Sequence, residues 1–516
     1  MRLRIDKRYL LLPVSPTAAD KRLRISVGGE LRRDLSLRIL ADGEYTYSYD
    51  MRDFLGCEAE LSLAPEVACE FRLSDHPAPL PPGAERYRPA AHFTAPSGWI
   101  NDPNGLVYYK GLYHLFYQHN PVGNGWGNMH WGHAVSEDLF TWRDLPEALF
   151  PDAMGTMFSG SAFVDFENVS GLGSREDPAL LLFYTAAGGT SELSAGKRYT
   201  QCLAWSRDGL HFTKYEKNPV LPHIAGENRD PKVCACAETG GYVMALYLEG
   251  CTYGIYGSEN LLSWQEICRI DLPGDSECPD FHPIAAPDGS RLWLLSGAAG
   301  KYILGRFDGK CFVPQSPVRS HVGEGNCSYA AQTFSAVPDG RILRLAWDRA
   351  KIPNSPFQSA MTAPVELSVA EYGGELWLAA KPIAVYDGRP VTELPAGEMR
   401  QAEIELPAGA ASISLRARGE ETFELRLFGL RLRVDAKAGE LSGGGCRLPL
   451  FAEEEISIRI LCDRTSTEVW TGDGKGTLCI PHVADPGLCR LEISAPAGLY
   501  IEKLTAATLS DREVRA

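Results

Sequence analysis

Three carboxylic acids occupy predicted turns beside apolar segments, and together they could carry acid–base chemistry. Asp102 lies in the segment 99–105 (WINDPNG), Asp230 lies directly before a proline, and Glu277 lies two residues before one. Two carboxyl groups that face one cleft can cleave a glycosidic bond, with one acting as nucleophile or base and the other as acid. Cleavage of a sugar linkage is therefore one hypothesis for this set of residues.

Each acid also has an ordinary structural interpretation. Pro-Asn-Gly after Asp102 is a strong turn signal, and an aspartate there often hydrogen-bonds its own backbone. Arg229 beside Asp230 would usually form a surface ion pair of small consequence. Glu277 alone is more simply a solvated loop residue, although the thiol and proline that follow it make a setting that suits a general acid. The catalytic hypothesis therefore depends on whether the fold brings the three acids together.

The elements that must position these acids are predicted to be short β-strands. Apolar, aromatic runs at 106–109 and 112–117 flank Lys110-Gly111, which predicts a hairpin with a two-residue turn. No long segment has the 3.6-residue periodicity of an amphipathic helix. Similar strand-like runs recur at 180–184, 242–247, 291–295 and 342–347.

A short repeat separates several of these strands. The segments 136–142, 206–212 and 258–264 share the pattern S-x-[DN]-x-x-x-[WF]. A turn with an aromatic plug that returns after several strands is typical of β-propeller blades. The inner strands of a propeller surround one channel, so this fold would allow the three distant acids to converge.

The chain of 516 residues is too long for a single core, and its flanks differ from the repeat region. Residues 1–88 contain short strand candidates and end in a proline-rich stretch, which predicts an N-terminal β-rich domain and a stiff linker. Residues 89–388 would form the catalytic propeller. Residues 392–516 alternate apolar and polar side chains between glycine-rich turns, which predicts a β-sandwich. The predicted fold is therefore all-β, with three parts.

The composition of the chain limits the classes of molecule that we expect it to bind. The net charge of -15 argues against nucleic acid and anionic membrane surfaces. No apolar run reaches the roughly 18 residues of a membrane-spanning helix. The N-terminus lacks the apolar core and cleavage site of a signal peptide, so we expect a cytoplasmic protein with reduced thiols. Among its 14 cysteines, Cys234 and Cys236 form a C-x-C without further matched ligands, so we expect no metal and no cofactor.

The segment 92–105 resembles the nucleophile motif of glycoside hydrolase family 32, which contains invertases, fructan β-fructosidases, levanases and inulinases. The resemblance implies a five-bladed β-propeller followed by a C-terminal β-sandwich. It also implies that Asp102 is the nucleophile, Glu277 the acid/base and Asp230 the stabiliser of the transition state. Further stretches agree with the family in order, among them 117–121, 131–134, 158–162, 229–231, 277–280, 329–334, 359–364 and 460–470.

We expect a second set of residues to contact a terminal fructofuranosyl unit. Arg229 would hold a carboxylate or hydroxyl group with its planar guanidinium. Each aromatic candidate could instead be a core residue, which is least natural for Trp126 in its glycine-rich loop. The expected hydroxyl ligands are Asn101, Gln118 and Ser159, and the expected aromatic walls are Trp99, Trp126, Phe158 and Trp347.

The resemblance favours a retaining β-fructosidase for fructo-oligosaccharides, fructans and sucrose. A sucrose-6-phosphate hydrolase or invertase, a fructosyltransferase and a non-catalytic carbohydrate-binding propeller stay open as alternatives. Cys327 and Val365 occupy positions where the family usually has an acidic residue and an arginine. The detailed architecture of the sugar-binding subsites, and with it the substrate, is therefore not predicted. Residues 7–14 are similar to the start of a β-domain on some gut-bacterial fructanases, which favours fructan over sucrose 6-phosphate. Homo-oligomerisation is also left open.

Overall fold

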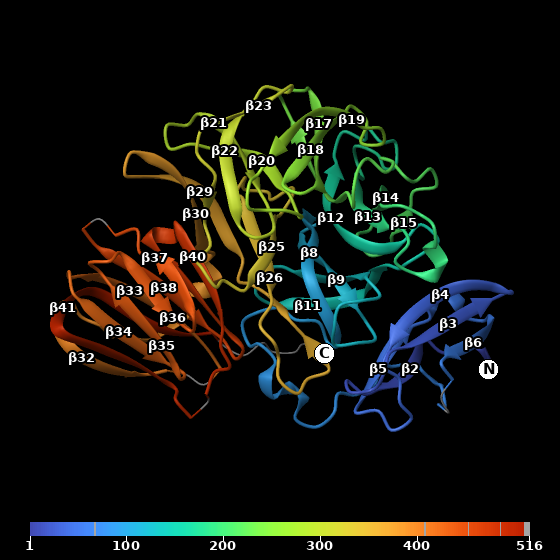
Figure 1. The fold of residues 1–516 in the computed structure, drawn as a ribbon, viewed down its shortest axis with the longest axis horizontal. Coiled ribbons are helices and arrows are strands. Elements are labelled where there is room, and N and C mark those ends of the chain that lie inside the picture. The colour runs from blue at the N-terminus through green and yellow to red at the C-terminus, as the bar shows by residue number, and fades with distance from the viewer. Residues whose placement is uncertain (67–68, 407–408, 453, 486, 510–516) are drawn as a thin grey trace.

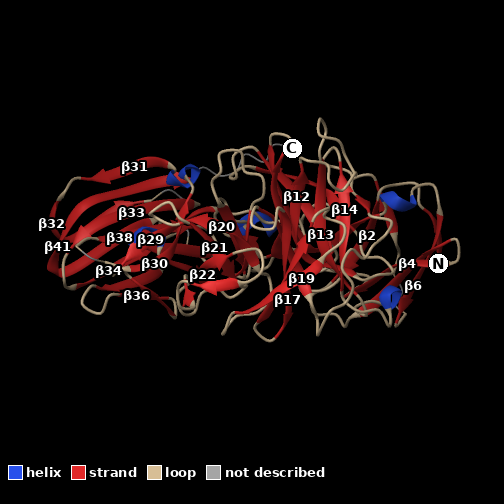
Figure 2. Ribbon diagram, turned by 90° about the horizontal axis from the view of Figure 1, so that it is seen from above, coloured by secondary structure: helices blue, strands red, loops and turns tan. Residues whose placement is uncertain are grey.

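The protein is described by a computed structural model that covers residues 1–66, 69–406, 409–452, 454–485 and 487–509. Three parts lie in a row, with an N-terminal β-domain, a central propeller and a C-terminal β-sandwich (Figures 1 and 2). Within the described ranges no helix has the length and apolar character needed to cross a membrane. The helical segments are short 3-10 turns: η1 (Arg52–Phe54), η2 (Ala84–Tyr87), η3 (Glu192–Ser194), η4 (Ala384–Asp387) and η5 (Gly472–Gly474).

The N-terminal strands form two small sheets that share one core. One sheet has the order β1-β6-β3-β4 and the other has the order β5-β2-β7. Alternate residues of β2 are buried, so Leu10 and Leu12 pack with Leu23, Ile25 and Tyr47 in this core. The strands are β1 (Arg2–Arg4), β2 (Tyr9–Val14), β3 (Lys21–Val27), β4 (Glu30–Leu37), β5 (Tyr45–Asp50), β6 (Glu58–Ala64) and β7 (Arg72–Ser74).

The central part is a ring of five sheets within the described residues 98–382. The first two blades consist of β8 (Gly98–Tyr109), β9 (Leu112–Asn120), β10 (His130–Ser136) and β11 (Trp142–Leu149), then β12 (Thr156–Asp165), β13 (Ala179–Ala187), β14 (Thr200–Ser206) and β15 (Thr213–Lys214). The third blade consists of β16 (Arg229–Cys236), β17 (Gly241–Glu249), β18 (Thr252–Ser258) and β19 (Gln265–Asp271).

The fourth and fifth blades follow the same meander with short added strands. The fourth consists of β20 (Asp280–Ala285), β21 (Arg291–Ser296), β22 (Lys301–Phe307), β23 (Phe312–Pro314) and β24 (Arg319–Ser320). The fifth consists of β25 (Ser328–Thr333), β26 (Leu343–Asp348), β28 (Ala360–Met361), β29 (Val365–Tyr372) and β30 (Glu375–Pro382). The five-bladed prediction is therefore confirmed, as is the hairpin, in which Tyr109 of β8 pairs with Leu112 of β9.

The ring closes where the chain returns from the fifth blade to the first. The short strand β27 (Phe357–Gln358) pairs in parallel with the start of β8, with Phe357 opposite Gly98. Gly98 has φ 86°, and a Cβ atom there would lie 2.3 Å from the carbonyl oxygen of Asn120. Glycine is therefore required at the point where three chain segments meet, three residues before Asn101.

The C-terminal strands form one sheet that folds back on itself to make the two layers of the sandwich. The 20-residue strand β41 pairs with β32 and β34 in its first half and with β31 and β33 in its second half. Inward apolar side chains from both halves form a separate core. The strands are β31 (Arg389–Leu394), β32 (Gly397–Glu405), β33 (Ala410–Arg418), β34 (Thr422–Leu427), β35 (Leu430–Asp435), β36 (Glu440–Gly443), β37 (Cys446–Pro449), β38 (Ile456–Cys462), β39 (Ser466–Thr471), β40 (Gly476–Pro481) and β41 (Arg490–Leu509).

Buried charges join the sandwich to the segment that precedes β8. The carboxylate of Asp463 accepts hydrogen bonds from the backbone N–H groups of residues 90, 91 and 92. The imidazole of His92 lies between two carboxylates, with Nδ1 2.8 Å from Asp463 and Nε2 2.7 Å from Glu468. All three side chains are buried. The sandwich is therefore docked on the propeller by charge as well as by apolar packing.

Candidate active site

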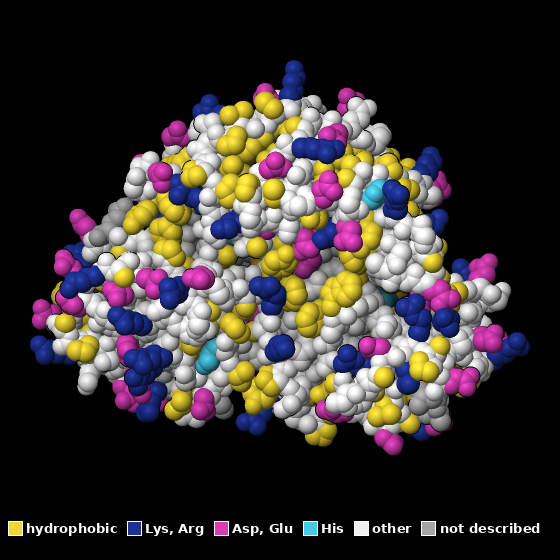
Figure 3. Space-filling view, in the orientation of Figure 1, with side chains coloured by type: hydrophobic (Ala, Val, Ile, Leu, Met, Phe, Trp, Pro, Cys, Tyr) yellow, Lys and Arg dark blue, Asp and Glu magenta, His cyan; other side chains and the backbone are white. Residues whose placement is uncertain are grey.

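The three predicted carboxylates are brought to the central channel by different blades. The innermost strands β8, β12, β16, β20 and β25 contact one another around the ring. Asp102 lies on β8, Asp230 lies on β16, and Glu277 lies three residues before β20. In Figure 3 acidic and basic side chains gather near the centre of the propeller face, beside hydrophobic ones. The convergence that the catalytic hypothesis requires is present in the fold.

Irregular backbone geometry orients the side chains of the three carboxylic acids. The register of β8 shifts between Ile100 and Pro103, and that of β16 shifts between Arg229 and Lys232. Such bulges redirect the side chains of a strand and are common beside active sites. Asp230 and Glu277 also have positive φ angles of 65° and 57°. Non-glycine residues seldom adopt this conformation, which often marks a functional site.

Asp102 is held by hydrogen bonds of different strength. The Ser159 hydroxyl on β12 donates to Asp102 Oδ2 at 2.6 Å, and Cys278 Sγ lies 3.5 Å from the same oxygen. The Asn101 side chain adds a further hydrogen bond that favours the ionised form of this carboxylate. Together these contacts orient Asp102.

Cys278 connects the first carboxylate to the second. Its backbone N–H donates to Asp230 Oδ2 at 3.0 Å, and its thiol lies 3.5 Å from that atom and from Asp102 Oδ2. The two aspartates thus approach one buried thiol from separate blades. They lie close enough to act on one small sugar ring.

Glu277 has a partner on each carboxylate oxygen. Arg229 donates to Oε1 at 2.6 Å, and the Tyr329 hydroxyl of β25 donates to Oε2 at 2.7 Å. The Tyr253 hydroxyl donates to the backbone carbonyl of Glu277 at 3.1 Å, which holds the strained loop. The Glu277 side chain is 31% exposed, so it can reach both water and a ligand. This position suits a residue that exchanges protons.

Burial makes the ionised forms of the two aspartates costly. It raises the pKa of Asp102, and the charge of Glu277 adds to this effect while the hydrogen bond from Ser159 opposes it. Burial also raises the pKa of Asp230 to about 7, although the adjacent Arg229 opposes that shift. A positive charge that developed among these carboxylates would relieve their mutual repulsion, as the oxocarbenium-like transition state of glycoside cleavage would.

The expected sugar-contacting residues fall into two groups. Asn101, Gln118 and Ser159 are buried, and the Gln118 amide donates to the Met157 carbonyl oxygen at 2.8 Å. Trp126 is instead 63% exposed, so its interpretation as a core residue is excluded. The expected aromatic walls form two contacting pairs, with Trp99 against Trp347 at a centroid distance of 5.7 Å and Trp126 against Phe158 at 6.0 Å.

The sequence interpretation missed several residues of the site. Cys278 and Tyr329 contact the carboxylates and Tyr253 contacts the backbone carbonyl of Glu277, yet none of them was assigned a role. Tyr329 begins the family-like segment 329–334, which was an available signal. Tyr253 lies in an ordinary strand and offered no signal, because only the packing of blade three against blade four reveals its contact.

A buried ion pair joins the inner strands within the ring. Lys232 of β16 lies 3.0 Å from Asp280 of β20, and both side chains are almost fully buried. Lys232 Nζ also donates to the carbonyl and hydroxyl oxygens of Thr333 on β25, at 2.7 and 2.9 Å. Removing one member would leave the other charge uncompensated, so this group holds three blades in register.

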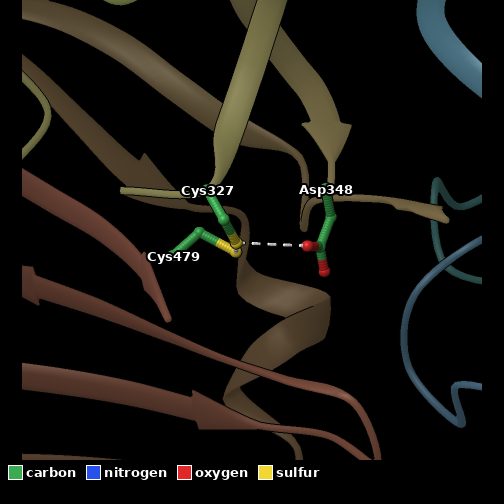
Figure 4. Close-up of side chains that lie close together, drawn as sticks. All are labelled: Cys327, Asp348 and Cys479. Carbon is green, nitrogen blue, oxygen red and sulfur yellow. Dashed lines mark hydrogen bonds between the residues drawn. The ribbon is translucent and has the colours of Figure 1, made fainter. Parts of the chain in front are cut away.

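One group among the described residues has metal-ligand chemistry. Cys327, Asp348 and Cys479 offer ligand atoms within 4.8 Å of one another, and all three are buried. Figure 4 shows them where the fifth blade meets the sandwich, with Cys327 Sγ 3.4 Å from Asp348 Oδ1 and 3.3 Å from Cys479 Sγ. None of them contacts the three carboxylates in the hydrogen bonds above. The cysteine at 327 thus packs against a second cysteine in the interface.

Comparison with known proteins identifies the family. Residues 92–380 match the glycosyl hydrolases family 32 N-terminal domain. The chain is 33% identical over 485 residues to a levanase of Bacillus subtilis (strain 168). This match covers 82% of this chain and 70% of that protein. The chain belongs to glycoside hydrolase family 32. This family 32 chain is also 29% identical over 479 residues to an extracellular exo-inulinase of Aspergillus awamori, covering 76% of this chain and 88% of that protein.

The fold of this family 32 glycoside hydrolase agrees with a solved structure. The crystal structure of the Aspergillus awamori exo-inulinase aligns with a TM-score of 0.73 at 24% identity, over 82% of this chain and 98% of that chain. The predicted family, enzyme class and propeller-plus-sandwich architecture are thus confirmed. The additional N-terminal β-domain, whose strands lie within residues 2–74, precedes the family match.

Proposed function

We propose that this family 32 enzyme is a retaining β-fructosidase that removes terminal β-D-fructofuranosyl units from fructo-oligosaccharides and fructans, and also cleaves sucrose. The named relatives, a levanase and an exo-inulinase, support this substrate class. One structural observation carries the mechanistic part: Asp102 and Asp230 come from separate blades and meet at Cys278, the residue that follows Glu277. Such a group fits one sugar ring and a covalent, two-step cleavage.

In the first step Asp102 attacks the anomeric carbon of the terminal fructosyl unit. Its hydrogen bond from Ser159 at 2.6 Å orients the carboxylate, and burial raises its pKa, so charge transfer to the substrate is favoured. Glu277, in its protonated form, gives its proton to the leaving oxygen. The bond to the leaving sugar breaks as the ester bond between Asp102 and the fructosyl carbon forms.

In the second step water replaces the enzyme on the sugar. Glu277, now ionised, takes a proton from a water molecule, and the resulting oxygen attacks the anomeric carbon and releases Asp102. Two inversions retain the configuration of the anomeric carbon. Arg229 and Tyr329 hold the two oxygens of Glu277 throughout, which keeps this carboxyl group beside the leaving and attacking oxygens.

Asp230 has no proton to transfer in this scheme. It is 6% exposed and lies 3.8 Å from Arg229, so it is suited to bind ring hydroxyl groups and to face the positive charge of the transition state. The aromatic pair Trp99 and Trp347 and the pair Trp126 and Phe158 would wall the ring.

Product analysis tests the proposal. The enzyme is incubated with sucrose, sucrose 6-phosphate, 1-kestose, inulin and levan, and the products are separated and identified. We expect free fructose from the oligosaccharides and fructans, and NMR of the first product should show the β-anomer. Absence of fructose from every substrate, or an inverted first product, would contradict the proposal. Products longer than the substrate would indicate a fructosyltransferase instead.

The acid/base role has its own test. Glu277→Gln should lower kcat for sucrose and fructan far more than for an activated aryl β-fructofuranoside, because an activated leaving group needs less protonation. Equal losses on both substrate types would remove Glu277 from this role. The comparison also excludes a purely carbohydrate-binding propeller, which would show no turnover for the mutation to reduce.

A further inference from the structure

A cavity of about 430 Å³ lies between the N-terminal β-domain and the first two blades. Strands β3 and β4 form one wall, and the loop between β9 and β10 with the loop after β13 forms the other. Figure 1 shows β4 beside the propeller, where it contacts η3. The residues used below are Arg22, Asp34 and Arg38 on one wall and Trp126, Asn128 and Thr190 on the other.

The walls have the chemistry of a site for a neutral, hydroxyl-rich ligand. Arg22 lies 2.9 Å from Asp34, and Arg38 lies 3.1 Å from Asp20, so the charges of the walls balance. Both arginines are partly exposed, at 41% and 48% of the side chain, and keep free N–H directions toward solvent. A balanced wall of planar donors and acceptors suits hydroxyl groups better than an anion.

An aromatic surface completes this chemistry. Trp126 borders the cavity and is 63% exposed, which is unusual for so large an apolar side chain. Pockets for small ligands combine such aromatic surfaces with a few placed polar groups. One face of a sugar ring could pack on this indole while its hydroxyl groups met the opposite wall.

A series of side-chain contacts leads from the cavity to the catalytic carboxylate. The Trp126 ring contacts the Phe158 ring at a centroid distance of 6.0 Å. The next residue, Ser159, donates the 2.6 Å hydrogen bond to Asp102. A chain with its terminal unit at Asp102 would therefore pass Trp126 before its following units reached the cavity.

The N-terminal domain also holds the loop that presents Trp126. The Ser36 backbone N–H donates to Asn128 Oδ1 at 2.8 Å, and Asn128 Nδ2 donates to the Ser36 carbonyl oxygen at 2.7 Å. Within the loop, Asn120 Nδ2 donates to the Gly125 carbonyl oxygen at 2.8 Å. The loop is therefore fastened on both sides of Trp126, once by the N-terminal domain and once by the propeller.

A second loop of the propeller is fastened in the same way. Asp34 Oδ2 accepts a hydrogen bond from the Glu192 backbone N–H at 2.7 Å, and Arg24 pairs with the Glu192 carboxylate at 2.7 Å. The residues before Glu192, including Thr190, line the cavity. Both walls are thus held by direct contacts, so the cavity is a fixed feature of the joined domains.

We propose that the N-terminal β-domain and the Trp126 loop form an additional sugar-binding subsite for the fructosyl units on the leaving side of the scissile bond. This inference rests on the proposed β-fructosidase function and extends it to chain length. Arg22 and Arg38 would bind hydroxyl groups of these units, and Trp126 would support their rings. The enzyme would therefore favour fructo-oligosaccharides of several units over sucrose, which has a single unit beyond its terminal fructosyl group.

Kinetics with substrates of different length test this subsite. kcat/KM is measured for sucrose and for a fructose-terminated pentasaccharide with the wild-type enzyme, Arg38→Ala and Arg22→Ala/Arg38→Ala. We expect the pentasaccharide-to-sucrose ratio to fall by about 3-fold in the single variant and about 10-fold in the double variant, as for the loss of one or two hydrogen bonds that solvent weakens at these exposed arginines. The matched control is Arg32→Ala, an exposed arginine of β4 whose partner is Glu30 and which lies outside the cavity walls; its ratio should match wild type.

The results of these kinetic measurements distinguish the subsite proposal from the β-fructosidase proposal on which it rests. A wild-type enzyme that cleaves both sugars, with an unchanged ratio in Arg38→Ala and in the double variant, overturns the subsite and leaves the β-fructosidase intact. A wild-type enzyme that cleaves neither sugar overturns both proposals. Arg38→Ala alone still decides the matter if the double variant fails to fold, because within the described part of the chain Arg38 donates only to the exposed Asp20 and to the Pro16 carbonyl oxygen.

Discussion

Asp102 combines a 2.6 Å hydrogen bond from Ser159 with a burial cost that raises its pKa. Asp102→Asn keeps the shape of the side chain and removes the nucleophile. We expect kcat to fall on the order of 10⁴-fold or more, as for removal of other enzymic nucleophiles. The melting temperature should stay the same or rise, because a buried carboxylate is replaced by a neutral amide. Turnover within tenfold of wild type, or an unfolded variant, would contradict the assignment.

Tyr329 contacts the other reacting carboxyl group. Tyr329→Phe removes the 2.7 Å hydrogen bond to Glu277 Oε2 without removing the ring. A hydrogen bond to a charged group contributes about 1.5–3 kcal/mol, so we expect kcat/KM to fall about 10- to 100-fold. The pH profile of kcat should change as well, because the removed group contacts the proton-transferring residue.

Tyr242→Phe is the matched control for this variant. Tyr242 is a partly buried tyrosine of β17, and its ring packs on Phe163 in the core between blades. Its kcat/KM and pH profile should equal those of wild type. Identical behaviour of the two tyrosine variants would show that Tyr329 is only a packing residue.

The turn that recurs in the sequence has one physical cause. In blades one, two and three a serine side chain accepts hydrogen bonds from the backbone N–H groups two and three residues later. The Asp or Asn two residues after that serine accepts bonds from the next pair of N–H groups. This double turn leads from the third strand of each blade to the fourth. The propeller interpretation of the repeat was therefore correct.

The fourth blade contains half of the same turn. Asp308 Oδ1 accepts hydrogen bonds from the Lys310 and Cys311 backbone N–H groups, as its counterparts do. The position of the serine is occupied by Arg306. A pattern search that required serine could not detect this copy.

Asp138→Ala tests the contribution of one such turn. Asp138 accepts N–H bonds from Phe140 and Thr141 at 2.8 and 2.6 Å, and losing a comparable cap costs about 1 kcal/mol. We expect the free energy of unfolding to fall by about that amount, measured by chemical denaturation. Glu137→Ala, at the exposed neighbouring position, should leave it within about 0.5 kcal/mol. Equal losses in the two variants would mean that the turn adds no specific stability.

Docking of the sandwich on the propeller depends on His92. Burial opposes its protonation, but hydrogen bonds to Asp463 and Glu468 raise the His92 pKa to about 10. Asp463 has the complementary shift, since hydrogen bonds from His92 outweigh its burial and lower its pKa to about 2. Burial instead raises the pKa of Glu468, which His92 opposes. The stability of the docked sandwich therefore depends on pH through the cluster of His92, Asp463 and Glu468.

The direction of this dependence follows from the His92 and Asp463 shifts. A histidine whose pKa is raised stabilises the folded state fully below its unfolded value of about 6.5, and this contribution is lost as pH rises toward 10. An aspartate whose pKa is lowered stabilises above its unfolded value of about 3.9, and this contribution is lost as pH falls toward 2. The two contributions are both present between about pH 4 and 6.5.

His92→Gln tests the cluster. Breaking a buried charged pair costs about 3–5 kcal/mol, so we expect a lower melting temperature at pH 6. The difference between wild type and variant should shrink from pH 6.5 to pH 10, as measured by thermal denaturation across that range. His211→Gln is the matched control, because His211 pairs with Asp208 at an 85% exposed position. A constant difference at every pH would show that the charge of His92 does not stabilise docking.

The sequence predicted much of the architecture because strand patterns are local. The alternation of apolar and polar residues and the two-residue turn at Lys110-Gly111 depend only on neighbouring residues, and both appear in the structure. The ordered family motifs predicted the family for the same reason. The pairing of distant strands could not be predicted from local sequence patterns. The single folded sheet of the sandwich, for example, forms because the 20-residue strand β41 pairs with strands that lie far apart in the chain.

For the candidate site, local sequence patterns were enough to predict the chemical types, namely three carboxylates at turns with aromatic residues nearby. The surroundings of these carboxylates could not be predicted in this way. Cys278 lies between two aspartates, Tyr329 donates to Glu277, and the N-terminal domain reaches the Trp126 loop, because packing joins blades and domains that are distant along the chain. Local sequence determines which chemical groups are present. The carboxylates become buried and come close to their partners only when the ring of blades closes.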